Sequence, residues 1–217
     1  MRISIFAYTK QGMVTAEKII SIFSADDFSC FAPERLAGGC FKAVDKEKKV
    51  YAESFKNSDV LIFVGATGIA VRSIAPYVES KLSDPAVVCV DELAKHVIAL
   101  LSGHMGGANG IAQKLAAALG ADPVISTATD INKRFSVDSW ALRNDCRISD
   151  MGLAKTVSAR ILEEDIPLCS DFHIASGFPG GTYPGISGEL GILISIYDKK
   201  PFQKTLQLIP KAVNIGI

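Results

Sequence analysis

The chain has 217 residues, 48% of them hydrophobic, and its 23 Lys and Arg residues balance its 23 Asp and Glu residues. This length can bury a core, and the lack of net charge argues against nucleic acid as a partner. The five cysteines form no CxxC pair, which argues against a disulfide framework or zinc ribbon and favours reduced, mostly buried thiols. Neither a signal peptide nor an apolar run of the roughly 18 residues that a membrane span needs is present, so we expect a cytoplasmic protein without membrane contact.

The first part of the chain alternates apolar strands with helical stripes. Residues 2–8 alternate apolar and polar side chains, as a strand does. Further strands are expected at 29–31, 59–64, 86–90, 96–101 and 123–126, and helices at 12–23, 51–56, 68–77 and 107–119. Gly120 is expected to cap the last of these helices. The pattern predicts an α/β domain over residues 1–135, with a doubly wound, mainly parallel sheet of the Rossmann-like or flavodoxin-like kind.

A second, smaller α/β domain is predicted for residues 136–217. Helices are expected at 141–147 and 152–164, and strands at 166–169, 190–197 and 205–209. The stretch 178–185 is rich in glycine and proline and is interpreted as an irregular loop. The last residues, 212–217, are apolar and strand-like, so the chain looks cut within a strand.

Two glycine-rich loops each follow an apolar strand and open a helix, at residues 65–72 and 102–109. Backbone N–H groups at the start of a helix favour anionic ligands. Ligands of doubly wound sheets bind outside the carboxyl ends of the strands, where these loops and residues 126–130 are expected to line one rim. The candidate ligand-binding residues are Gly65, Thr67, Gly68, Arg72, Ser102, Gly103, Gly106, Gly107, Asn109, Thr127, Thr129 and Asp130.

Five segments in order between residues 63 and 130 resemble the cobalt-precorrin-5A hydrolases of anaerobic cobalamin (vitamin B12) biosynthesis, the CbiG family. They are Phe63–Arg72, Ser83–Val88, Val90–Glu92, Leu101–Asn109 and Thr127–Asp130. Five ordered matches are far more specific than one glycine motif. Members of that family carry a third, C-terminal domain that begins near a Gly-Ile-Gly-Cys word. This chain finishes where that word would start, so we expect it to lack that domain.

The resemblance implies a hydrolase acting on a carbon–carbon bond. The family opens the δ-lactone of cobalt-precorrin-5A and releases the carbon-20 unit as acetaldehyde, giving cobalt-precorrin-5B. Its substrate is a flat tetrapyrrole fringed with carboxylates that carries the cobalt itself, so no cofactor and no protein metal site are expected. Neighbouring enzymes of the corrin pathway are further candidate partners. The alternative is a noncatalytic module that binds and hands on the tetrapyrrole, with the chemistry in the missing domain. A nucleotide-binding domain is disfavoured because neither loop carries GxGxxG or GxxxxGK[ST].

Lactone opening needs an activated water, and His104 is the first candidate base because imidazole titrates near neutrality. It could instead be a structural loop histidine or an axial contact to the cobalt. Asp91 and Glu92 could orient His104 or act as the base, or form a solvated strand end. Arg72 could clamp a substrate carboxylate or be a surface helix arginine, and Asp130 could bind substrate or stabilise a turn.

Overall fold

A computed structural model describes residues 1–23, 27–45, 47, 49–80, 83–174 and 177–211. The chain divides into two compact units, Met1–Ile125 and Ser126–Ile217, whereas the sequence placed the division after residue 135. The expected strand at 212–217 lies outside the described residues. No helix in the described ranges is both long and apolar enough to cross a membrane.

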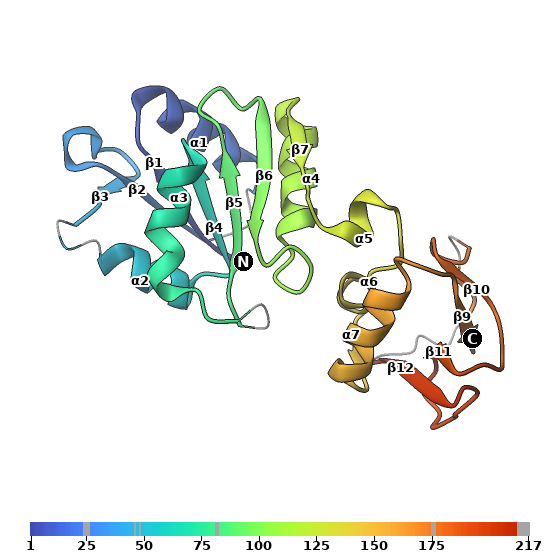
Figure 1. The fold of residues 1–217 in the computed structure, drawn as a ribbon. Helices are drawn as coiled ribbons and strands as arrows, with labels where there is room; N and C mark the ends of the chain where they lie inside the picture. The colour runs from blue at the N-terminus through green and yellow to red at the C-terminus, as the bar shows by residue number, and fades with distance from the viewer. Residues whose placement is uncertain (24–26, 46, 48, 81–82, 175–176, 212–217) are drawn as a thin grey trace, which may run out of the picture. The chain divides into compact units, whose positions relative to one another are not determined.

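The first unit is built on a seven-stranded sheet in the order β3-β2-β1-β4-β5-β6-β7 (Figure 1). Its strands are β1 (Arg2–Ala7), β2 (Asp27–Ala32), β3 (Phe41–Ala43), β4 (Val60–Val64), β5 (Ala86–Val90), β6 (His96–Leu101) and β7 (Asp122–Val124). Every neighbouring pair is parallel except β5 and β6, which are antiparallel. The mainly parallel sheet is confirmed, and the reversed β6 decides where the glycine loops lie.

Helices cover both faces of this sheet, as a doubly wound fold requires. They are α1 (Lys10–Ile22), α2 (Lys49–Asn57), α3 (Thr67–Ile74) and α4 (Ala108–Leu119), with short 3₁₀ turns at Glu34–Leu36 and Ala75–Tyr77. Because side chains alternate along a strand, Ile5 packs in a cluster with α1 and α4, whereas Phe6 packs in a second cluster with α2 and α3. Gly120 ends α4 in the left-handed conformation, with φ of 68°, as predicted.

The second unit contains a five-stranded sheet in the order β10-β9-β11-β12-β8. Its elements are α5 (Ala128–Ile131), α6 (Val137–Arg143), β8 (Cys146–Ile148), α7 (Met151–Arg160), β9 (Ile166–Ser170), β10 (Thr182–Pro184), β11 (Leu190–Ile194) and β12 (Lys204–Pro210). Only β12 and β8 pair antiparallel in this sheet, as far as the described residues show. The helix expected at 141–147 is wrong in its second half, because α6 ends at Arg143 and β8 begins at Cys146. The expected loop at 178–185 contains β10.

Candidate functional site

The reversed strand β6 separates the glycine loops that the sequence placed at one rim. Ala7, Val64 and Val90 lie side by side at the carboxyl ends of β1, β4 and β5, and we call this the carboxyl edge of the first unit. Strand β6 starts there and runs back, so that Leu101 pairs with Val87. A six-residue strand rises about 20 Å. The loop after Leu101 therefore leaves from the opposite edge of the sheet, and the prediction of one shared rim is wrong.

The loop at the carboxyl edge holds Gly65, Thr67, Gly68 and Arg72. The Gly65 amide donates to the Val90 carbonyl at 2.8 Å, which ties the loop to the sheet. An added Cβ at Gly65 would lie 3.2 Å from the Tyr8 ring, so glycine permits this close approach. Arg72 is exposed, and its Nη1 donates to the Gly68 carbonyl at 3.0 Å. The guanidinium is therefore held over the first turn of α3.

A cavity of about 530 Å³ lies beside this loop. Its lining residues include Tyr8, which follows β1, Tyr51 from α2, and Ile69 and Arg72 from α3. Strands β1 and β4 are neighbours from which the chain winds in opposite directions, the place where doubly wound sheets bind ligands. The Tyr8 and Tyr51 hydroxyls lie 3.2 Å apart, and burial raises the pKa of Tyr8, so Tyr8 is a neutral hydrogen-bonding group near neutral pH.

Asp91 stabilises the hairpin between β5 and β6. Its carboxylate accepts the backbone amides of Leu93 at 3.0 Å and His96 at 2.6 Å. Partial desolvation acts to raise the pKa of Asp91, but the backbone hydrogen bonds from His96, Lys95 and Leu93 outweigh it and hold the pKa below its usual value. His96 itself is exposed at the start of β6.

Glu92 links the same hairpin to α1. Its side chain accepts the Thr9 hydroxyl at 2.6 Å, and its carbonyl accepts the hydroxyl of the buried Thr15 at 2.7 Å. Thr9 also caps α1 by accepting the Gly12 amide at 2.9 Å. The prediction that Asp91 or Glu92 orients His104 is wrong, because β6 places them at opposite edges of the sheet.

The loop 102–109 at the opposite edge is tightly packed. An added Cβ at Gly106 would lie 2.5 Å from the Ser102 Cβ, and one at Gly103 would lie 2.6 Å from the Asn109 Oδ1. Gly107 has φ of 82°, and Ser102 also adopts a positive φ, 55°. The Ser102 hydroxyl is buried and has no hydrogen-bond partner among the described residues. Backbone strain and an unsatisfied buried group are costly, and such features gather at functional sites.

The same loop uses its own amides at the start of α4. The amides of Gly107, Ala108 and Asn109 donate to the carbonyls of His104, Ser102 and Gly103, at 3.0, 3.2 and 3.0 Å. These three amides are therefore engaged within the protein, contrary to the expectation that the Gly107 amide receives a carboxylate. His104 is half-buried on this fixed backbone. Recognition by the loop thus depends on its side chains more than on these amides.

The third candidate segment, Thr127–Asp130, belongs to the second unit. Thr127 precedes α5, and its hydroxyl donates to the Asp130 carboxylate. Thr129 is buried, and its carbonyl accepts the Arg134 amide at 2.7 Å. These contacts form a local turn, the structural alternative considered for Asp130.

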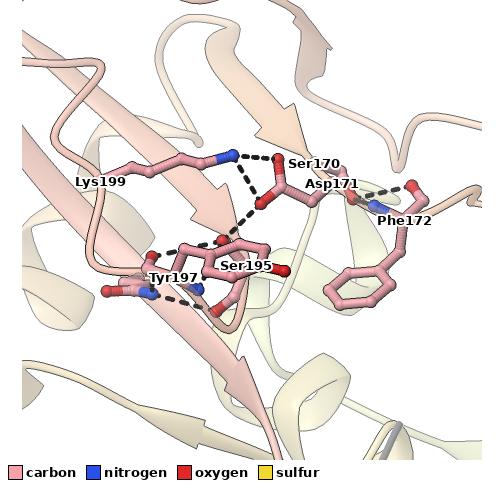
Figure 2. Close-up of polar contacts among 7 residues, drawn as sticks. Ser170, Asp171, Phe172, Ser195, Tyr197 and Lys199 are labelled. Atoms are coloured by element: carbon pink, nitrogen blue, oxygen red, sulfur yellow. Dashed lines mark hydrogen bonds and ion pairs between the residues drawn. The ribbon is translucent and has the colours of Figure 1, made fainter.

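A cluster of polar side chains, missed by sequence reasoning, surrounds Asp171, which directly follows β9 (Figure 2). Asp171 accepts the Ser195 hydroxyl and pairs with the Lys199 ammonium at 2.7 and 2.8 Å. Asp171 and Ser195 each directly follow a strand, β9 and β11, and this position at a strand end is the signal by which the sequence could have indicated the cluster. Within the described ranges, no group of three or more His, Cys, Asp or Glu residues could hold a metal ion.

The comparisons with known proteins agree on one family. Residues 49–130 match the family model described as cobalamin synthesis G N-terminal. Over 162 residues, 74% of this chain, the sequence is 43% identical to the cobalt-precorrin-5A hydrolase of Salmonella typhimurium, and over 52% of the chain it is 42% identical to that of Priestia megaterium. The matches span 45% and 29% of those two proteins, so the chain covers less than half the length of either.

A solved structure supports the fold. The crystal structure of a putative cobalamin biosynthesis protein G homolog from Sulfolobus solfataricus aligns with a TM-score of 0.57 at 24% identity, covering 96% of this chain and 60% of that one. The chain is thus a two-unit α/β protein, and the match to the cobalamin synthesis G N-terminal model lies mostly in its first unit. Its sequence is similar to those of the cobalt-precorrin-5A hydrolases, as the five matching segments predicted.

Proposed function

We propose that this chain forms part of a cobalt-precorrin-5A hydrolase of cobalamin biosynthesis. Relatives with this name are 42–43% identical to it, and the proposal extends their activity to a chain that matches less than half of their length. In the proposed reaction, water adds to the lactone carbonyl, and the acyl–oxygen bond breaks to give a carboxylate and a hydroxyl group on carbon 20. That hydroxyl group then loses its proton and becomes a carbonyl as the carbon–carbon bond to the macrocycle breaks. The electron pair of this bond passes to the macrocycle, so the carbon-20 unit leaves as acetaldehyde and cobalt-precorrin-5B remains. The substrate carries its own cobalt, so the protein supplies binding groups and a base.

The observation that carries the proposal is the constrained backbone that holds His104. Close glycine contacts at Gly103 and Gly106 and the positive φ of Ser102 fix the loop from which the imidazole projects. A base that is held in place before substrate arrives loses little entropy in the transition state. Asp91 and Glu92 each stabilise the β5–β6 hairpin, so of the three candidates we assign His104 as the base. Ser102 and Asn109 remain proposed contacts of the same site.

The second candidate function is a noncatalytic module that binds and hands on the tetrapyrrole to neighbouring enzymes of the pathway. The cavity at the carboxyl edge favours it, because Arg72 lines this cavity and is held by its contact with the Gly68 carbonyl. The Arg72 guanidinium suits a carboxylate, but the length of strand β6 separates it from His104. One lactone cannot contact both places, so the two functions make different demands on Arg72 and His104.

Acetaldehyde release from anaerobically prepared cobalt-precorrin-5A tests the proposal. We expect His104→Ala to lower release by at least about 100-fold while binding is retained, because a general base contributes roughly that factor or more. Arg72→Gln should weaken binding and leave the turnover of bound substrate unchanged. The Salmonella relative is assayed in parallel as a positive control, and acetaldehyde release by that protein shows that the substrate preparation is active. An inactive chain that still binds substrate in an Arg72-dependent way would favour the handover module instead.

A further inference from the structure

The second unit has a cavity of its own, about 670 Å³ in volume, at the carboxyl ends of its parallel strands. Ser170 and Ile194 lie opposite each other at the ends of β9 and β11, and both line it. The chain continues from β9 to β10 on one side and from β11 to β12 on the other. This is the point at which winding reverses, where open α/β sheets bind ligands, and the volume is typical of a small-molecule site.

The side chains that line this cavity favour a flat anion. Trp140 and Phe172 supply aromatic surface. Arg143 supplies a guanidinium, and His173 supplies an imidazole. Asn144 adds a polar side chain. Among the described residues that line the cavity, none is acidic. A conjugated ring packs well on aromatic side chains, and a guanidinium pairs with a carboxylate through two parallel hydrogen bonds.

Phe172 is fixed by the polar group behind it. The Ser170 hydroxyl donates to the Phe172 carbonyl at 2.8 Å and accepts the Phe172 amide at 3.1 Å. Asp171 points the other way, toward Lys199 and Ser195 (Figure 2). The Lys199 ammonium and the Ser195 hydroxyl hold the pKa of Asp171 below its usual range, so the carboxylate next to the cavity is paired with a cation of its own. The aromatic wall is therefore positioned before a ligand binds.

The opposite wall is the end of α6. Trp140 packs against Phe135 with the ring centroids 6.0 Å apart, and its carbonyl accepts the Asn144 Nδ2 at 2.9 Å. Arg143 is exposed, and its Nε donates to the Ser139 carbonyl at 3.3 Å. Among the described residues, this is the one side-chain hydrogen bond of Arg143, and it leaves both Nη atoms available for a bidentate partner.

We propose that this cavity binds one edge of a carboxylate-bearing tetrapyrrole, with a ring against Trp140 and Phe172 and a side-chain carboxylate on Arg143. The identity of the macrocycle rests on the proposed function, whereas the flat, anionic character of the ligand rests on the cavity itself.

Calorimetric titration of the 217-residue chain with uroporphyrin III, a flat macrocycle with eight carboxylates, tests this inference. Arg143→Gln should weaken binding about tenfold or more, because it removes a charge-assisted contact with a carboxylate. The matched control is Arg147→Gln, an exposed arginine in β8 that does not line the cavity, and it should bind within twofold of the parent. Emission of Trp140, the single tryptophan, should fall on binding in both variants at saturation.

Titration with indole-3-acetate, a small ring with one carboxylate, separates a macrocycle site from a general aromatic-acid site. We expect it to bind at least 100-fold more weakly than uroporphyrin III. Equal affinity of the two probes, or equal effects of Arg143→Gln and Arg147→Gln, would overturn the inference. Failure of acetaldehyde release with Arg143-dependent porphyrin binding intact would instead overturn the proposed hydrolase and leave this site standing.

Discussion

Gly106 and Gly110 lie four residues apart, and alanine should have opposite effects at the two positions. An alanine Cβ at Gly106 would lie 2.5 Å from the Ser102 Cβ, 2.9 Å from the Ser102 carbonyl oxygen and 3.3 Å from the Ala86 amide nitrogen. Backbone atoms cannot rotate away as the end of a long side chain can, and Ala86 begins the buried strand β5. Overpacking of this kind destabilises by about 1–3 kcal/mol.

Gly110 is the matched control. It lies within α4, and an added Cβ there would meet no atom within 4 Å. Alanine is favoured over glycine inside a helix by about 0.8–1 kcal/mol, so Gly110→Ala should stabilise the protein by that amount. The free energies of unfolding of the two variants should therefore differ by about 2–4 kcal/mol.

Denaturant titration followed by far-ultraviolet circular dichroism measures this difference. Gly106→Ala should unfold at a lower denaturant concentration than the parent, and Gly110→Ala at a higher one. A Gly106→Ala variant as stable as the parent would refute the close packing of loop 102–109, and with it the constrained setting proposed for His104. If Gly110→Ala were also less stable than the parent, the destabilisation of Gly106→Ala would reflect a general sensitivity to substitution near the start of α4 and not a close contact.

Three further predictions concern other parts of the first unit. Cys40 is exposed whereas burial raises the pKa of Cys30 to about 12, so brief alkylation followed by mass mapping should label Cys40 first, and equal labelling would contradict this. Thr9→Val removes the cap of α1 and should lower the free energy of unfolding by about 1 kcal/mol in a denaturant titration, whereas Thr9→Ser should retain most of it. The Arg2 backbone amide, aided by its side chain, holds the pKa of Asp59 below its usual value. The stabilisation from Asp59 is therefore present above its ordinary pKa and is lost as pH falls through the folded value, so Asp59→Asn should lose less stability than the parent between neutral pH and about pH 3.

Much of the fold could be predicted because its strands are short apolar runs separated by helical stripes. The direction of β6 was missed, although the sequence contained the signal. Only five residues connect Val90 to His96, and a crossover between parallel strands needs a dozen or more, so this connection is a hairpin. That length predicts an antiparallel β6 and places loop 102–109 at the edge opposite Gly65.

The errors in the second unit have local causes. Ser136 caps α6 by accepting the Ser139 amide, and this capping signal would have started the helix at Val137, as observed. Strand β10 lies at the edge of its sheet and ends in Pro184. Proline and glycine are typical of loops, so this short strand was predicted as part of a loop. The cavity beside Phe172 depends on strand order, which no local pattern specifies.

The most direct test of the account is acetaldehyde release measured side by side for His104→Ala and Glu92→Gln. Both residues were candidate bases in the sequence, but Glu92 holds the β5–β6 hairpin against α1, whereas His104 lies on the loop at the opposite edge. The account predicts a loss of at least about 100-fold for His104→Ala and a change of less than about fivefold for Glu92→Gln. Full activity in His104→Ala with a large loss in Glu92→Gln would contradict it and move the chemistry to the carboxyl edge.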